Sequence, residues 1–181
     1  MFLDTMVKRL IKIFLIFTGQ REQVFWGVHN VPLSILVVNF IFQRISRINS
    51  SCKWPVHFTS TVLAPDKIKI GRGVAKSFAQ SSNCYITGFN HVEISDDTIF
   101  APGVGIISAN HNPINHEQTK ELPIKIGKNC WLGMNSIILP GVELGDNVVV
   151  AAGSVVNKSF PSNVVIAGVP AAVKKQIDRE K

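Results

Sequence analysis

The sequence has few cysteines, and they form no pattern. Cys52, Cys84 and Cys130 are the only three among 181 residues, and their spacings are wide. A disulfide framework needs an even set of cysteines, and a zinc pattern such as CxxC needs close pairs. The sequence therefore favours neither and indicates a reducing compartment, so we expect a cytoplasmic protein.

Long hydrophobic runs are also lacking. An apolar run near the start covers only residues 13–17, and the stretch from Leu33 to Phe42 is interrupted by Ser34 and Asn39. A helix that spans a bilayer needs about 20 apolar residues, and the centre of a signal peptide is longer than five. We therefore expect neither a spanning helix nor a signal peptide.

Acidic residues are scarce, with 12 Asp and Glu against 19 Lys and Arg, and the formal net charge is +7. This balance suits an anionic partner, such as a phosphorylated small molecule or a membrane surface. The basic residues form no dense run and do not alternate with aromatic residues, as they do in proteins that bind single-stranded nucleic acid. Nucleic acid is therefore not an expected partner.

The chain divides into parts with different periods. We predict an N-terminal helical segment over residues 1–53, a β-helix over 54–175 and a tail over 176–181. In the first part, apolar residues recur at steps of three and four: Leu3, Met6, Val7, Leu10, Ile13, Phe14 and Phe17. Pro32 suits the first turn of a second helix. Two roles remain open for these helices: binding at an anionic membrane surface, and packing on the main domain or a partner subunit.

A period of six runs through the second half of the chain. Every sixth residue from position 126 is aliphatic: Ile126, Leu132, Ile138, Leu144, Val150 and Val156. Upstream, Ile70, Ile94, Phe100 and Ile106 fit the same beat, whereas Lys76, Ser82 and Gly88 do not. A six-residue repeat is typical of a β-helix, in which three repeats make one coil and each repeat supplies a short strand with one inward side chain.

The six-residue period is interrupted over residues 108–123. The step from Ile106 to Ile126 exceeds three whole repeats by two, so the chain leaves the register of the coil. The gap is rich in Asn and Pro and carries His111 and His116, which predicts an exposed loop on a rigid scaffold. A neutral imidazole can take a proton from a hydroxyl group and return it to a leaving group, so His111 is a candidate general base.

Several motifs in this sequence are specific to one family. The segments IGKNCWLG, LPGVELGDN and AGVPA, together with IFAPGVGIISANHNP, resemble the hexapeptide-repeat acyltransferases. The resemblance is greatest to bacterial sugar and polysaccharide O-acetyltransferases of the maltose, galactoside and colanic acid type, and it covers roughly residues 68–175. It implies a left-handed parallel β-helix, a homotrimer with active sites between subunits, and acetyl-CoA as donor.

The resemblance also assigns roles to individual residues. It implies that His111 is the general base and that Trp131 lies along the pantetheine or thioester. It places further coenzyme A contacts at Met134, Ala152, Asn157, Lys158 and Lys175. Two departures are that Asn157 replaces a usual threonine and that Ala172 stands where some relatives have a basic residue. Asn90 and His91, which precede His111 by roughly one coil, are candidates for the acceptor groove.

Other functions remain open on the same scaffold. A nucleotide-sugar N-acetyltransferase would have a similar donor half. A zinc hydratase of the β-helical carbonic anhydrase type would use His111, His116 and His91 as ligands. A third alternative is a membrane-associated scaffold without activity. We expect an O-acetyltransferase without a metal that acts on a sugar hydroxyl in the cytoplasm, at or near the inner face of the membrane.

Overall fold

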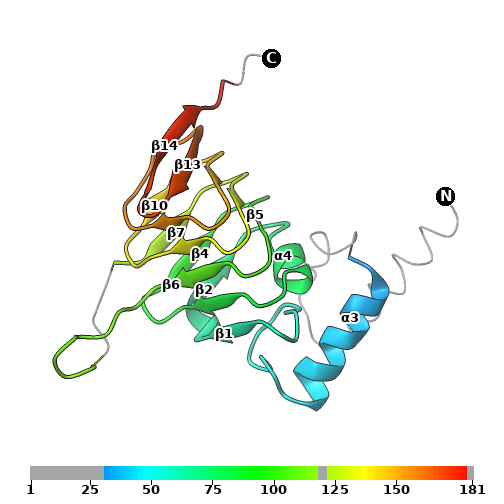
Figure 1. Cartoon of the computed structure of the whole chain (residues 1–181). Coiled ribbons are helices and arrows are strands. Elements are labelled where there is room, and N and C mark those ends of the chain that lie inside the picture. The colour runs from blue at the N-terminus through cyan, green and yellow to red at the C-terminus, as the bar shows by residue number, and fades with distance from the viewer. Residues whose placement is uncertain (1–30, 118–121, 179–181) are drawn as a thin grey trace, which may run out of the picture.

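The fold is a stack of short strands that follow one another around three parallel sheets (Figure 1). The computed structural model describes residues 31–117 and 122–178. We call the sheets first, second and third in the order in which each coil visits them. Each coil thus has a triangular outline, with a corner wherever the chain passes from one sheet to the next.

Each sheet collects one strand from each successive coil. The first sheet contains β1 (Thr61–Leu63), β3 (Tyr85–Thr87), β6 (Gly105–Ile107), β9 (Ile137–Ile138) and β12 (Val155–Val156). The second contains β2 (Ile68–Ile70), β4 (Val92–Ile94), β7 (Ile124–Ile126) and β10 (Glu143–Leu144). The third contains β5 (Ile99–Phe100), β8 (Trp131–Leu132), β11 (Val149–Val150), β13 (Val164–Gly168) and β14 (Ala171–Gln176). All pairings are parallel except that of β13 with β14, which close the stack as a hairpin.

The six-residue beat builds the core as predicted. The six aliphatic residues that start at Ile126 are all buried, and pairs that lie three repeats apart, such as Ile126 and Leu144, are directly opposite in the ladder. Small residues allow the coils to approach at the corners. A Cβ atom on Gly127 would lie 2.5 Å from the carbonyl oxygen of Gly145 in the next coil, closer than a side chain can come.

A helix explains why the six-residue period is irregular before residue 90. In the first coil, α4 (Ala75–Gln80) takes the place that a strand of the third sheet would occupy beneath β5. Phe78 packs edge-on against Phe100 with ring centroids 5.0 Å apart, and the backbone N–H of Phe100 donates to Ser77 Oγ at 3.1 Å. The helix therefore substitutes for a strand both in packing and in hydrogen bonding.

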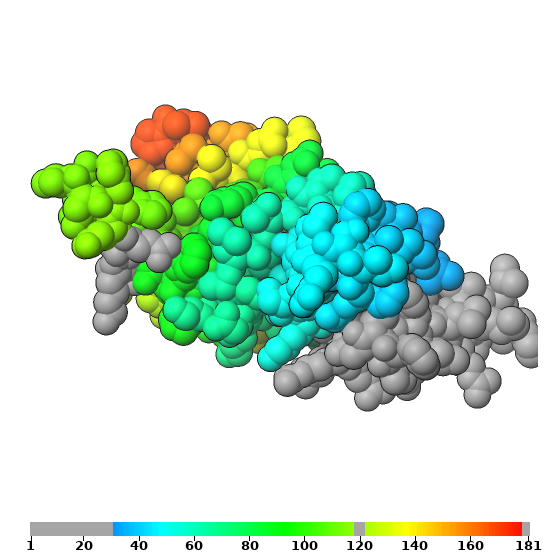
Figure 2. Space-filling model, turned by 90° about the horizontal axis from the view of Figure 1, so that it is seen from below, coloured from blue at the N-terminus to red at the C-terminus, as the bar shows by residue number. Residues whose placement is uncertain are grey.

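The described part of the N-terminal segment, from residue 31 on, lies at one side of the base of the stack (Figure 2). The second predicted helix is confirmed as α3 (Leu33–Phe40), which continues as a π-helical turn, η1 (Ile41–Ile45). Turns follow, and a 3-10 turn, η2 (Pro65–Lys67), leads into β2. The first predicted helix lies outside the described residues. Within residues 31–117 and 122–178, no helix is long and apolar enough to cross a bilayer.

The excursion is longer than the step from Ile106 to Ile126 suggested. Ile106 lies opposite Ile138 in the ladder, and Ile138 lies opposite Val156 in the next coil. In sequence, Ile106 and Ile138 are nearly twice as far apart as Ile138 and Val156, because the loop lies between Ile106 and Ile138. The step from Ile106 to Ile126 therefore crosses one corner and not a whole coil.

The three cysteines are free and buried. Burial raises the pKa of Cys52 to about 12, although nearby Arg44 opposes this shift, and burial also raises the pKa of Cys84 and Cys130. All three therefore serve as small apolar side chains of the core.

The inward column should carry most of the stability of the coils. We expect Ile138→Ala to lower the free energy of unfolding by about 3–4 kcal/mol, because Ile138 is fully buried and its truncation leaves a cavity. Glu143, which points outward beside Leu144 on the second sheet, provides the control, and Glu143→Ala should cost about 1 kcal/mol or less. Denaturant unfolding at one fixed protein concentration measures both. Equal losses would contradict the assignment of the inward column.

Candidate active site

His111 lies where the excursion leaves the stack. The chain exits after β6, at the corner between the first and second sheets, and Ser108 and Ala109 are still buried. His111, which follows shortly after them, is exposed. The stack thus fixes the backbone just before His111 and leaves the imidazole open to solvent. Figure 1 shows the loop extending well away from the coils.

A backbone carbonyl selects the tautomer of the His111 ring. His111 Nδ1 lies 2.7 Å from the carbonyl oxygen of His116. Because a carbonyl oxygen can only accept, Nδ1 must carry the hydrogen and donate it. In the neutral ring, Nε2 then has a free lone pair. This is the tautomer that a general base requires.

The loop supports this contact through its own hydrogen bonds. The N–H of Asn112 donates to the carbonyl of Glu117 at 2.8 Å, and the N–H of His116 donates to the carbonyl of Asn112 at 2.9 Å. The Asn115 side chain donates to Glu117 Oε2 at 2.9 Å. His116 has a φ of 57°, in the left-handed region, and this conformation turns its carbonyl into the loop. His116 contributes its backbone to the contact, not its ring.

The predicted acceptor residues, Asn90 and His91, hold both ends of the excursion. Asn90 donates from its backbone N–H to Ser108 Oγ at 3.1 Å and from Nδ2 to the Ser108 carbonyl at 2.9 Å. The carbonyl of His91 accepts from the N–H of Ile124 at 3.1 Å, at the return to the stack. Sequence reasoning missed Ser108. In the sequence it is visible only as a small polar residue at the end of the six-residue period, just before the loop.

The predicted pantetheine residues lie elsewhere on the chain. Trp131 starts β8 on the outer surface of the third sheet and is 53% exposed, in a row with Ile99 and Val149. Met134 and Ala152 are exposed at successive corners between the third and first sheets, where the carbonyl of Met134 accepts from the N–H of Gly153. We call this edge of the stack the Met134 edge.

The remaining predicted residues lie near the upper coils. Asn157 and Lys158 are exposed at the corner between the first and second sheets, two coils above the excursion, and the ammonium of Lys158 lies 5.7 Å from the centre of the Phe160 ring. We call this edge, with Asn90, His91 and His111, the loop edge. Lys175 is exposed on β14, opposite Val165.

One chain therefore does not bring all these residues together. His111, Asn90, His91, Asn157 and Lys158 share the loop edge. The first sheet separates them from Met134 and Ala152, and Trp131 projects from the third sheet. The residues predicted for the site thus lie in two groups on different sides of the prism, which we call the two predicted half-sites.

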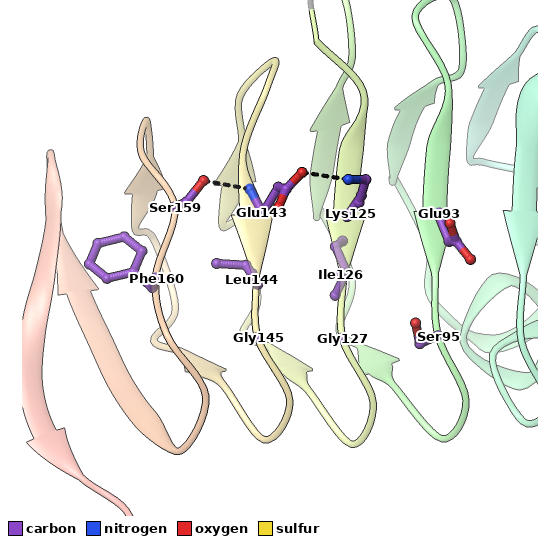
Figure 3. Close-up of a pocket in the computed structure, with 10 residues that line it drawn as sticks. All are labelled: Glu93, Ser95, Lys125, Ile126, Gly127, Glu143, Leu144, Gly145, Ser159 and Phe160. Carbon is purple, nitrogen blue, oxygen red and sulfur yellow. Dashed lines mark hydrogen bonds and ion pairs between the residues drawn. The ribbon is translucent and has the colours of Figure 1, made fainter.

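The second sheet carries a charged ladder that sequence reasoning did not identify. Lys69 pairs with Glu93 at 2.8 Å, and Lys125 pairs with Glu143 at 2.7 Å, which raises the pKa of both lysines. Figure 3 shows the groove along this face, from Glu93 to Phe160. In the sequence, this ladder is visible only as Lys and Glu that alternate at outward positions of neighbouring coils. Because each lysine already faces a carboxylate, this ladder offers a ligand little net charge.

No group of three His, Cys, Asp or Glu side chains that could hold a metal ion is found in residues 31–117 and 122–178.

Comparison with known proteins matches the repeats to one family model. Residues 123–158 match the model described as the hexapeptide repeat of succinyl-transferase. The expected resemblance to the hexapeptide-repeat acyltransferases is confirmed. A solved galactoside acetyltransferase in complex with coenzyme A has a TM-score of 0.57 and 25% identity, over 97% of this chain and 82% of that chain. The left-handed parallel β-helix with a short N-terminal helix is likewise confirmed.

Two curated relatives are similar over the β-helix. The galactoside O-acetyltransferase of Escherichia coli K12 is 41% identical over 114 residues, which are 60% of this chain and 56% of the relative. The putative lipopolysaccharide biosynthesis O-acetyl transferase WbbJ of the same strain is 36% identical over 126 residues, which are 61% of this chain and 64% of the relative. The chain thus spans less than two thirds of either relative.

The hydrogen bond to His116 should be visible in the His111 ring. We expect nitrogen-15 NMR of the neutral ring to show hydrogen on Nδ1 and none on Nε2, since only Nδ1 faces the carbonyl. The His111→Ala protein identifies the signal. His91 gives a comparison within the same protein, since its carbonyl, not its ring, has the described contact. A ring with hydrogen mainly on Nε2 would contradict the geometry.

Proposed function

We propose that this protein is an acetyl-CoA-dependent O-acetyltransferase that acetylates a hydroxyl group of a sugar or a surface-polysaccharide precursor. The observation that carries the proposal is the 2.7 Å contact from His111 Nδ1 to the His116 carbonyl, which leaves Nε2 as a free base at an exposed loop. The relatives with galactoside and lipopolysaccharide in their names support a sugar acceptor.

The chemistry requires one proton carrier. His111 Nε2 takes the proton of the acceptor hydroxyl, and the oxygen attacks the thioester carbonyl of acetyl-CoA. The tetrahedral intermediate then collapses with cleavage of the carbon–sulfur bond. The departing thiolate takes this proton from Nε2, so the products are the acetyl ester and coenzyme A. The His116 carbonyl stabilises the imidazolium that exists between the two proton transfers.

The surfaces of the prism favour an assembly that joins the half-sites. The outer rows of the first and third sheets are apolar and include the exposed residues Tyr85, Ile99 and Trp131, whereas the second sheet carries the Lys–Glu ladder. We infer a homotrimer in which the first sheet of one subunit packs near the third sheet of the next. His111 of one subunit would then share a cleft with Trp131 and Met134 of its neighbour.

Coenzyme A would extend along this cleft. Trp131 and the corner residues Met134 and Ala152 would contact the pantetheine arm from one side, and Asn157 and Lys158 from the other. Lys158 and Lys175 supply positive charge for the phosphates of the nucleotide end. We place the enzyme in the cytoplasm, since its three cysteines are free thiols of the core.

Replacing the base should remove turnover and spare donor binding. We expect His111→Ala to lower kcat by roughly 10²–10⁴-fold and to leave acetyl-CoA affinity by calorimetry unchanged. His116→Asn is the matched control, because asparagine accepts the left-handed backbone and keeps the carbonyl, so its kcat should stay within about threefold of wild type. Unchanged turnover in His111→Ala would refute the assignment of His111 as the base.

A panel with hydroxyl and amino sugars tests the acceptor, and acetylation of the amine alone would refute O-transfer.

The shared site can be tested by mixing two variants that we expect to be inactive, one in each predicted half-site. In every trimer that contains both His111→Ala and Trp131→Ala chains, one of the three clefts combines an intact His111 with an intact Trp131 of the neighbour. Co-expression with two different tags, followed by sequential purification, gives these mixed trimers. We expect activity to reappear only in them. Absence of recovery would show that both residues act within one subunit.

A further inference from the structure

The N-terminal helix has its polarity inverted relative to an ordinary surface helix. The side that packs on the base of the stack buries two polar side chains, Asn39 and Gln43, each 1% exposed, beside Leu36. On the outer side of α3 and η1 the exposed residues are aliphatic except Ser34. A helix on the surface of a water-soluble domain normally shows the reverse pattern, with its apolar stripe toward the core.

The buried polar residues fix the helix to the body of the protein. Asn39 Nδ2 donates to the carbonyl of Ala79 in α4 at 2.9 Å. Gln43 donates from Nε2 to the carbonyls of Cys52 and Trp54 at 3.2 and 3.0 Å, and its Oε1 accepts from the N–H of Val56. These contacts satisfy the amide of Gln43 and leave α3 little freedom to rotate. The outer stripe is therefore held in place.

The outer stripe consists of large aliphatic residues at helical spacing. They recur at steps of four and then three, and each is at least 37% exposed: Leu33, Val37, Ile41, Ile45 and Ile48, with Val38 beside them. Ile45 is the most exposed, at 71%. Single exposed aliphatic residues are ordinary, but a contiguous row on a rigid helix marks a contact surface.

The charge around the stripe indicates the chemistry of its partner. Between residues 31 and 65 there is no Asp or Glu, whereas Arg44, Arg47 and Lys53 give three positive charges. Arg47 lies between Ile45 and Ile48 in the sequence, and Arg47 and Lys53 are exposed. An apolar row with basic residues and no acidic ones matches the boundary between the headgroups and acyl chains of an anionic bilayer.

We propose that the outer stripe of α3 and η1 binds the surface of an anionic lipid bilayer. The aliphatic side chains enter the headgroup boundary, and Arg47 and Lys53 lie at the level of the negative headgroups. This proposal does not depend on the acetyltransferase function. Figure 2 shows α3 at one side of the base of the stack, and this side then faces the membrane, whereas the β13–β14 hairpin lies at the other end of the stack.

Vesicle binding of the full chain tests this surface. We expect wild-type protein to sediment with vesicles that contain phosphatidylglycerol and to bind pure phosphatidylcholine vesicles far more weakly. Ile41→Glu/Ile45→Glu should lower the partition coefficient by roughly tenfold or more, since it removes apolar burial and adds repulsion. Arg47→Gln/Lys53→Gln should lower it by about fivefold per charge. The matched control, Val169→Glu, changes an aliphatic residue that is 72% exposed in the hairpin turn, and should leave binding unchanged.

Melting temperature and mass in solution distinguish the other occupants of the stripe. We expect Ile41→Glu/Ile45→Glu to keep the wild-type Tm and the wild-type mass by light scattering. A lower mass would show that a second copy covers the stripe, and a lower Tm at constant mass would show that another part of the same chain covers it. Either result overturns the proposal. Equal binding to neutral and anionic vesicles, or undiminished binding of the double variant, overturns it as well.

Discussion

Everything in this structure depends on coils that stack in register. Parallel strands lie about 4.8 Å apart, so each coil must return to the same outline after every turn. One aliphatic side chain per strand then points inward, and small residues such as Gly127 allow close approach at the corners. The inner column tolerates little change. The outer faces are less constrained, and a corner can admit an insertion, so both can take on different tasks.

The same constraint explains the form of the catalytic loop. An insertion can leave the stack only at a corner, and its backbone then has no neighbouring strand to bond with. The excursion meets this need with local bonds among Asn112, His116 and Glu117, and its two ends are held by the turn at Asn90 and His91. The orientation of the His111 ring is a result of that local network, since its partner is a carbonyl within the loop.

Sequence could predict those features that repeat. The six-residue period predicts the inward column from Ile126 to Val156 and the loop before it. The position after Pro32 predicts α3. Sequence could not show that AKSFAQ is a helix in place of a strand, because this choice depends on packing against Phe100. It could not reveal the contact to the His116 carbonyl either, because every residue has a carbonyl. The separation of Trp131 from His111 required the register of the coils, which the extra length of the excursion obscures.

The proposed membrane surface and the candidate base lie at the same end of the molecule. The excursion leaves from β6, whose coil is the third from the base, so about 10 Å of stacking separates its root from the lowest coil. Figure 1 shows the loop extending toward the lower end of the stack, on the side opposite α3. A bilayer that contacts α3 and extends beneath this end of the stack would therefore lie on the side toward which the loop points. That geometry suits an acceptor sugar carried on a lipid, because such a sugar is confined to the same thin layer as the enzyme.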